Sequence, residues 1–243
     1  FNVDTVNLAA QDIPAATSVL VIADPKTAFL PAEQEKLEQY IASGKNLLVI
    51  TEPGSQQVLA PLLLQLDIQP GDAPVQEESR DYAPDFILAG FSGSAGDVSP
   101  KLAALHADSA VVSMLGAVNL RYGTRFHTVP LLVTKDNQAL AVAIERKQQG
   151  KTQRIIVAGD ADFLSTAELS RHKPSVWNQP FITEMFRWFT YGEFPVNTGA
   201  IKSTDAIDSD DKGILTMRIF FFGFLPVSLL IFAAVLLLYR KRR

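Results

Sequence analysis

The sequence predicts a three-layer α/β domain built on a mostly parallel sheet and followed by one C-terminal transmembrane helix. Short, continuous apolar runs predict strands that are buried on both faces, as the strands of parallel sheets are. A segment with amphipathic helical spacing separates the first two runs, which indicates a βαβ unit. Near the C-terminus, 21 consecutive residues carry no charge, which is the length of a membrane span.

The βαβ unit lies in the first 51 residues. Residues 18–23 form the first apolar run, which stops at an Asp-Pro pair. Pro31 suits the first position of a helix, and Gly44 suits its end. Residues 46–51 repeat the strand pattern and stop at a Glu-Pro-Gly turn. Because parallel strands need a crossover connection, this order predicts two parallel neighbours.

The middle of the chain gives a less regular pattern. Residues 71–96 are rich in Pro, Gly, Asp and Ser, which predicts a loop with one short strand at residues 85–89. Further strands are expected at residues 110–115, 118–122, 129–134 and 139–145, the last two as a hairpin.

A third buried strand is predicted at residues 154–158, and it leads directly into the segment Gly159-Asp160-Ala161-Asp162-Phe163. A short helix is expected after Ser165, whose spacing to Glu168 is that of a capping box. Residues 178–190 place aromatic side chains on one helical face, which predicts packing against the sheet.

The C-terminal sequence predicts how the chain meets a membrane. Residues 219–239 form the predicted span, in which Pro226 is tolerated because neighbouring groups can satisfy the freed backbone. The basic residues that follow the span predict a cytoplasmic C-terminus; they are Arg240, Lys241, Arg242 and Arg243. The predicted organisation is an extracytoplasmic α/β domain (1–195), a polar tether (196–218), the span (219–239) and a cytoplasmic basic tail (240–243). Since the sequence begins at Phe1 without an export signal, we expect a fragment of, or a piece processed from, a longer membrane protein.

Composition excludes several functions. The net charge is -4 and the pI about 5.4, which gives no electrostatic footprint for nucleic acid. The chain has no cysteine, so disulfides, thiolate metal sites and a cysteine nucleophile are excluded. It also lacks a Walker sequence, a dinucleotide fingerprint and a G-x-S-x-G elbow. We therefore expect no cofactor, no metal and no catalytic residue.

Four carboxylates are the candidate ligand-binding residues. Asp24, Glu52, and the pair Asp160 and Asp162 each follow the carboxyl end of a predicted parallel strand, where open α/β sheets bind ligands. They could bind a metal or another polar ligand. The alternative is that they only hydrogen-bond loop amides at strand ends, and the absence of a histidine near any of them in the sequence favours this.

Three segments resemble the auxiliary components of ABC transporters typified by the gliding-motility GldG-like proteins. Residues 13–50 follow that family's order of a strand ending in Asp-Pro, a helix opening with Pro-Ala-Glu-Gln-Glu, and a second strand. Residues 139–165 contain AVAIERK and RIIVAGDADFLS, similar to the family's GDSDFLSN-like block. Residues 178–192 resemble its N…LFLNAVNWL-type helix, although here Phe-Arg-Trp-Phe replaces Asn-Trp-Leu.

The resemblance implies an extracytoplasmic domain with a fold like class I glutamine amidotransferases, related to flavodoxin-like folds, without their nucleophile. It implies a location in the bacterial inner membrane, with the main domain periplasmic and the span in contact with the lipid bilayer. The expected function is that of a non-enzymatic accessory subunit of an ABC transporter. Its domain would bind substrate or a periplasmic partner, and its span would pack on a permease that works with a separate ATPase. The alternative is a membrane-anchored hydrolase that acts on cell-envelope polymers through the strand-end carboxylates.

Overall fold

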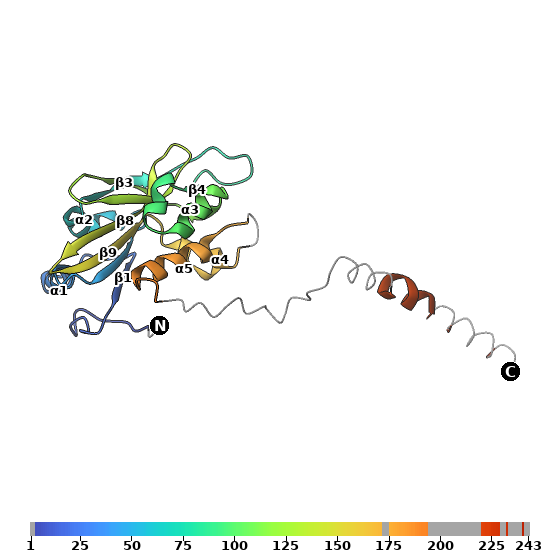
Figure 1. The fold of residues 1–243 in the computed structure, drawn as a ribbon, viewed down its shortest axis with the longest axis horizontal. Coiled ribbons are helices and arrows are strands. Elements are labelled where there is room, and N and C mark those ends of the chain that lie inside the picture. The colour runs from blue at the N-terminus through green and yellow to red at the C-terminus, as the bar shows by residue number, and fades with distance from the viewer. Residues whose placement is uncertain (1–2, 172–174, 194–219, 229–231, 233–239, 241–243) are drawn as a thin grey trace. The chain divides into compact units, whose positions relative to one another are not determined.

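The computed structural model describes residues 3–171, 175–193, 220–228, 232 and 240. The chain divides into two units, Phe1–Val196 and Asn197–Arg243. The first unit contains every strand of the described structure (Figure 1).

The strands are β1 (Val19–Ala23), β2 (Asn46–Ile50), β3 (Ile68–Pro74), β4 (Phe86–Phe91), β5 (Val111–Leu115), β6 (Val118–Tyr122), β7 (Thr128–Val133), β8 (Ala139–Gln148) and β9 (Lys151–Ala158). The α-helices of the first unit are α1 (Pro31–Ala42), α2 (Gln56–Gln65), α3 (Pro100–Ala107), α4 (Thr166–Leu169) and α5 (Asn178–Phe189). Two short 3-10 helices are η1 (Gly93–Asp97) and η2 (Asp162–Leu164).

The main sheet is mixed, which corrects the predicted fold class. Its seven strands have the order β1-β2-β9-β8-β7-β4-β5. The β1–β2 and β2–β9 pairs are parallel. All pairs from β9 to β5 are antiparallel. A mostly parallel sheet of the flavodoxin or glutamine amidotransferase type is therefore wrong for this chain.

The antiparallel half follows from a tight turn between β8 and β9. Gln148 pairs with Lys151, so only Gln149 and Gly150 connect the two strands. Both residues have positive φ, 48° and 75°, as in the two-residue turns that match the twist of a hairpin. A parallel neighbour would need a crossover of a dozen residues or more, which this connection does not contain.

The prediction failed because parallel and antiparallel strands of this sheet are alike covered on both faces. Along β2, Leu48 and Ile50 pack into the core under α3 and α5, whereas Leu47 and Val49 pack into the core under α1 and α2. The first six residues of β8 are all buried in the same way. A strand buried on both faces is a continuous apolar run in the sequence whatever its direction. The two groups of helices therefore form layers on either side of the sheet (Figure 1).

The second sheet is an antiparallel ribbon of β3 and β6. The strand predicted at residues 118–122 is β6, whereas β3 and the pairing of the two strands were not predicted. Residues 71–74 of β3 belong to the Pro- and Gly-rich segment that was predicted as loop. Gly71 has a steric role, because a Cβ there would lie 1.9 Å from Asn119 Oδ1 on the neighbouring strand. The glycine that indicated a loop instead permits close approach within the ribbon.

In the second unit, Phe220–Phe224 forms a π-helical turn, η3, and residues 225–228, with Pro226, continue as α-helix. Among the described residues, no helix combines the length and apolar character needed to cross a membrane. The predicted transmembrane helix over 219–239 is thus not found, and most of that range lies outside the described residues. The predicted tether (196–218) and the tail residues 241–243 also lie outside them.

Candidate functional site: an acidic group at the strand ends

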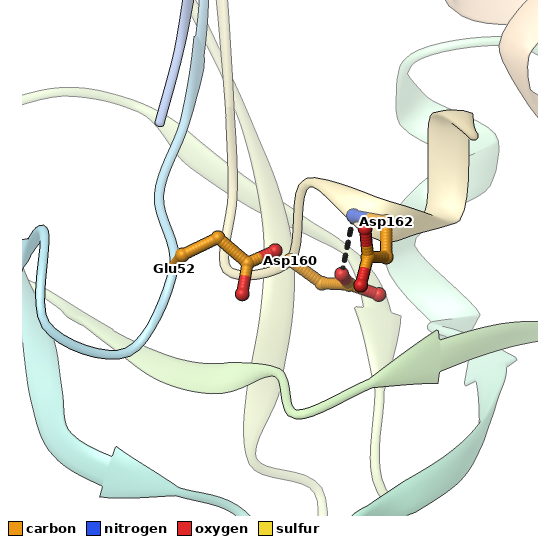
Figure 2. A group of neighbouring side chains, drawn as sticks. All are labelled: Glu52, Asp160 and Asp162. Carbon is orange, nitrogen blue, oxygen red and sulfur yellow. Dashed lines mark hydrogen bonds between the residues drawn. The ribbon is translucent and has the colours of Figure 1, made fainter. Parts of the chain in front are cut away.

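Three of the four predicted carboxylates lie together at one edge of the parallel strands. Ile50 of β2 pairs with Ala158 of β9, so the loops after both strands begin side by side. One carboxylate oxygen each from Glu52, Asp160 and Asp162 lies within 4.8 Å of the others. Figure 2 shows Glu52 approaching from the loop after β2 and the two aspartates from the turn after β9.

Asp160 is the buried centre of this acidic group, with no exposed surface. Its Oδ2 accepts a hydrogen bond from the Leu115 amide at 2.9 Å, and its Oδ1 accepts one from the Asp162 amide at 2.7 Å (Figure 2). Glu52 accepts a bond from the Ala161 amide through Oε1 at 2.5 Å. The two carboxylates therefore hold the loops after β2 and β9 and the end of β5 together.

The preceding residue, Gly159, permits this arrangement. A Cβ at Gly159 would lie 2.0 Å from the Val118 carbonyl oxygen, which no side chain can tolerate. The close approach is held by hydrogen bonds from the Val118 amide to Gly159 O and from the Gly159 amide to Leu140 O, both 2.8 Å. Gly159 and Asp160 of the GDADF segment thus have structural roles, one steric and one in hydrogen bonding.

The electrostatics of the group favour a bound proton. Burial, with the nearby charge of Glu52 adding to it, raises the pKa of Asp160 to about 8. A hydrogen bond between the Asp160 and Glu52 side chains raises the pKa further, while the two backbone amides oppose the shift. Burial and the charge of Glu52 therefore both favour a proton shared by this pair of carboxyls.

Asp24 lies outside this group but is linked to it by a residue that sequence reasoning missed. Lys26 forms an ion pair with Asp24 Oδ2. The hydrogen bond to Asp24 raises the pKa of Lys26, and the charges of Asp24, Glu52 and Asp162 act in the same direction. Asp24 Oδ1 is buried and has no hydrogen-bond partner among the described residues. The sequence did contain a signal for this residue, because Lys26 lies two positions after Asp24, which follows a predicted strand.

The group can act chemically in two ways. Carboxylate oxygens are the ligands that hard divalent cations prefer, so Glu52, Asp160 and Asp162 have a suitable donor set. A cation would have to displace the proton held by Asp160, whose oxygens already accept two amides. The second way is recognition of a polar partner, because the surface here presents charges of both signs. They come from the exposed Asp162, the half-buried Glu52 and the exposed Lys26.

The fold and the site define a mixed α/β domain with an acidic group at one edge of its parallel strands. Two carboxylates of this group, those of Asp160 and Glu52, accept hydrogen bonds from backbone amides. A family model described as an ABC-type uncharacterized transport system, the auxiliary family of ABC transporters, matches residues 1–66. This match covers β1, α1, β2 and α2, and with them Asp24 and Glu52. It supports an auxiliary component of an ABC transport system. It does not test the finer resemblance to GldG-like proteins.

Solved structures give a likeness in fold. The mmIFT52 N-terminal domain matches with a TM-score of 0.58 and 18% sequence identity over 75% of this chain and 81% of that chain. A cytoplasmic protein from Salmonella typhimurium matches at 0.41 and 17% identity, over 72% of this chain and 71% of that one. An exo-beta-1,4-mannosidase from an Opitutaceae bacterium matches at 0.38 and 10%, over 75% of this chain and 26% of that one. A search of the curated proteins found no match. At 18% identity, the likeness to the mmIFT52 N-terminal domain concerns the fold alone. The TM-scores of the other two structures are too low to establish a shared fold.

Proposed function

We propose that this chain is a non-enzymatic accessory component of an ABC transporter of the GldG-like type. The observation that carries the proposal is the family match to residues 1–66, which includes the β1–α1–β2 unit and the strand-end residue Glu52. The domain binds the transported substrate or a periplasmic partner at the acidic edge. The expected partners are a permease, contacted by residues 219–239, and a separate ATPase.

The geometry of the acidic group supports binding in preference to hydrolysis. Asp160 has no exposed surface and accepts two backbone amides, so a polymer substrate has no access to it. Glu52 is also engaged, through the Ala161 amide. The groups that remain accessible are Asp162 and Lys26, which are suited to polar recognition rather than to a paired acid and base.

One observation favours the alternative, a membrane-anchored hydrolase of cell-envelope polymers. The pKa of Asp160 is raised by burial and by Glu52, and a raised carboxyl pKa is the property of a glycosidase general acid. Hydrolysis would require the loop after β9 to open and expose Asp160. Asp160→Asn and Asp162→Asn would then each lower the rate on an envelope polymer by several orders of magnitude with folding intact.

We also propose a location at the bacterial inner membrane with the main domain on the periplasmic side. The support is in the sequence, where the charge-free residues 219–239 precede four basic residues. Because the chain has no cysteine, Leu64→Cys on the exposed face of α2 gives a single labelling site. A membrane-impermeant maleimide should label it in intact spheroplasts, and labelling only after lysis would contradict the proposal.

The transporter proposal is tested by purifying the full chain from native membranes in mild detergent. A permease and a protein with a Walker sequence should co-purify in stoichiometric amounts. If the acidic edge binds a partner protein, Asp162→Asn should lower the recovery of that protein several-fold, whereas Glu35→Gln on exposed α1 should not. Absence of any ATPase and permease from the purified wild-type chain would refute the assignment.

A further inference from the structure

Two arginines share one aromatic ring on the side of the main sheet that α1 and α2 cover. The Cζ atom of Arg125 lies 5.1 Å from the centroid of the Phe126 ring, and the Cζ atom of Arg146 on β8 lies 4.8 Å from it. Phe126 itself packs against the core under α1 and α2. The ring attracts both cations, but it also brings two like charges together, which is unfavourable unless a negative charge lies nearby.

Neither guanidinium has a carboxylate partner within the part of the chain that the structure describes. By contrast, Arg154 and Arg171, which also lie over aromatic rings, are each paired with a glutamate. Burial lowers the pKa of Arg146, and the charge of Arg125 lowers it further. The pair is therefore a concentration of positive charge that the described residues leave unneutralised.

Arg146 is held in place by a buried glutamine. Its Nε donates to Gln153 Oε1 at 2.8 Å. Gln153 has no exposed surface, and its Nε2 donates to the carbonyl oxygens of Ile41 at 2.9 Å and Lys45 at 2.6 Å. These bonds fix the amide so that Oε1 faces Arg146. Because Nε uses only one donor, the donors on Nη1 and Nη2 of this half-buried guanidinium remain for a ligand.

The loop that carries Arg125 is fixed by Asp67. Asp67 Oδ2 accepts a hydrogen bond from the Arg125 amide at 2.9 Å, and the Asp67 carbonyl oxygen accepts one from the Gly123 amide at 3.0 Å. Gly123 permits this contact, because a Cβ there would lie 2.3 Å from Asp67 Oδ2. Segments distant in the sequence thus place both arginines before any ligand binds, which lowers the entropic cost of binding.

We propose that Arg125 and Arg146 bind a phosphate group, either free or as a monoester. A phosphate monoester carries a charge of about −1.5 to −2 at pH 7, which neutralises two arginines, whereas a carboxylate supplies a single charge. Guanidinium groups match the geometry of phosphate oxygens, and the exposed Arg125 can turn toward a phosphate held by Arg146. The site is separate from the acidic group, because Gln153 lies in the first half of β9 and Asp160 follows its last residue. It does not depend on the transporter assignment.

Calorimetric titration of the full chain in detergent with inorganic phosphate tests the site. Low ionic strength is needed because salt screens exposed charges. We expect one phosphate to bind per chain. Arg125→Gln and Arg146→Gln should each raise the dissociation constant about tenfold or more, because a charge-assisted contact is lost. The matched control is Arg187→Gln, which removes a charge from an exposed position on α5, on the opposite face of the sheet, and should leave the dissociation constant unchanged.

A second variant separates loss of the site from loss of folding. Arg146→Lys keeps the charge and the apolar stem but not the planar fork, so it should keep the wild-type melting temperature and bind phosphate several-fold more weakly. Glycerol 3-phosphate distinguishes the two sources of the phosphate group. Binding at least as tight as that of inorganic phosphate would identify a monoester, such as a lipid headgroup, whereas weaker binding would identify free phosphate; either result upholds the site.

Four results would each overturn the proposal. The first is no binding of phosphate by the wild-type chain up to about 10 mM. The second is unchanged binding by Arg125→Gln and Arg146→Gln. The third is the same weakening in Arg187→Gln as in Arg146→Gln, which would indicate attraction by net charge alone. The fourth is binding of acetate as tight as that of phosphate, because a single charge would then satisfy the pair.

Discussion

Replacing Glu52 by glutamine should change how the stability of this domain depends on pH. In the folded chain, the pKa of Asp160 is raised from an ordinary value near 3.8 to about 8 by burial and by the charge of Glu52. Between these two pH values the folded state holds a proton that the unfolded state has released. The stabilising contribution of Asp160 is therefore fully present below pH 3.8 and is lost as the pH rises through about 8.

The magnitude follows from the size of that interval. Each pH unit within it costs about 1.4 kcal/mol of unfolding free energy, so the total is on the order of 5 kcal/mol. Burial is the largest cause of the shift and Glu52 the second, so we assign about 1–2 kcal/mol to Glu52. Glutamine keeps an oxygen for the Ala161 amide but loses the charge on that bond, at a cost of about 1 kcal/mol.

Glu52→Gln should therefore be slightly less stable than the wild type near pH 5 and at least as stable near pH 9. The difference corresponds to about 2–4 °C in melting temperature for each kcal/mol. Near-ultraviolet circular dichroism of the full chain is a suitable assay, because the two tryptophans, Trp177 and Trp188, both lie in the first unit. The control is Glu35→Gln, which removes the same charge from an exposed position on α1.

Parallel stability curves for Glu52→Gln and wild type between pH 5 and 9 would refute this reasoning. They would mean that the Glu52 charge does not act on Asp160. A wild-type stability that does not fall between pH 6 and 9 would refute the raised pKa itself.

Three further predictions concern the stability of the same domain. Gly159→Ala should lower the unfolding free energy by about 3 kcal/mol or more, because its Cβ would clash with Val118 O; a melting temperature within 3 °C of wild type would contradict this, by the same conversion. Asn178→Ala should cost about 2–4 kcal/mol, because it leaves buried groups of the β5 edge without partners; urea titration measures it, and an unchanged midpoint would show that the edge is not closed by this side chain. Gln149→Asn should add about 0.5 kcal/mol, because an Asn-Gly pair suits the positive φ angles at residues 149 and 150; a lower melting temperature would contradict the turn assignment.

The sequence identified the individual elements of the βαβ unit closely. The strand predicted at residues 46–51 is β2, Asn46–Ile50, and the helix predicted to begin at Pro31 is α1. These elements are local, because a buried strand is a short apolar run and a helix has an apolar stripe and termination signals. The direction of β8 and β9 was not readable, because burial on both faces gives the same apolar pattern in either direction.

For the site, the sequence placed Glu52 and Asp160 just after strands, and they do follow β2 and β9; that these two strands are neighbours came from the structure. The sequence did not show that Asp24 stands apart with Lys26, because loop conformation and not strand order decides where that side chain points. Nor did it show that Asp160 is buried and bonded to Leu115, because the two residues are far apart in the sequence.

By itself, the sequence determined that strands lie at residues 18–23, 46–51 and 154–158, that a helix begins at Pro31, and that carboxylates follow β2 and β9. Only the tertiary structure decided that the sheet is mixed, that Asp160 is buried beside Glu52, and that the pKa of Asp160 is raised. The physical reason is that local patterning records whether a side chain faces water. Strand direction, edge pairing and pKa depend instead on contacts between residues distant along the chain.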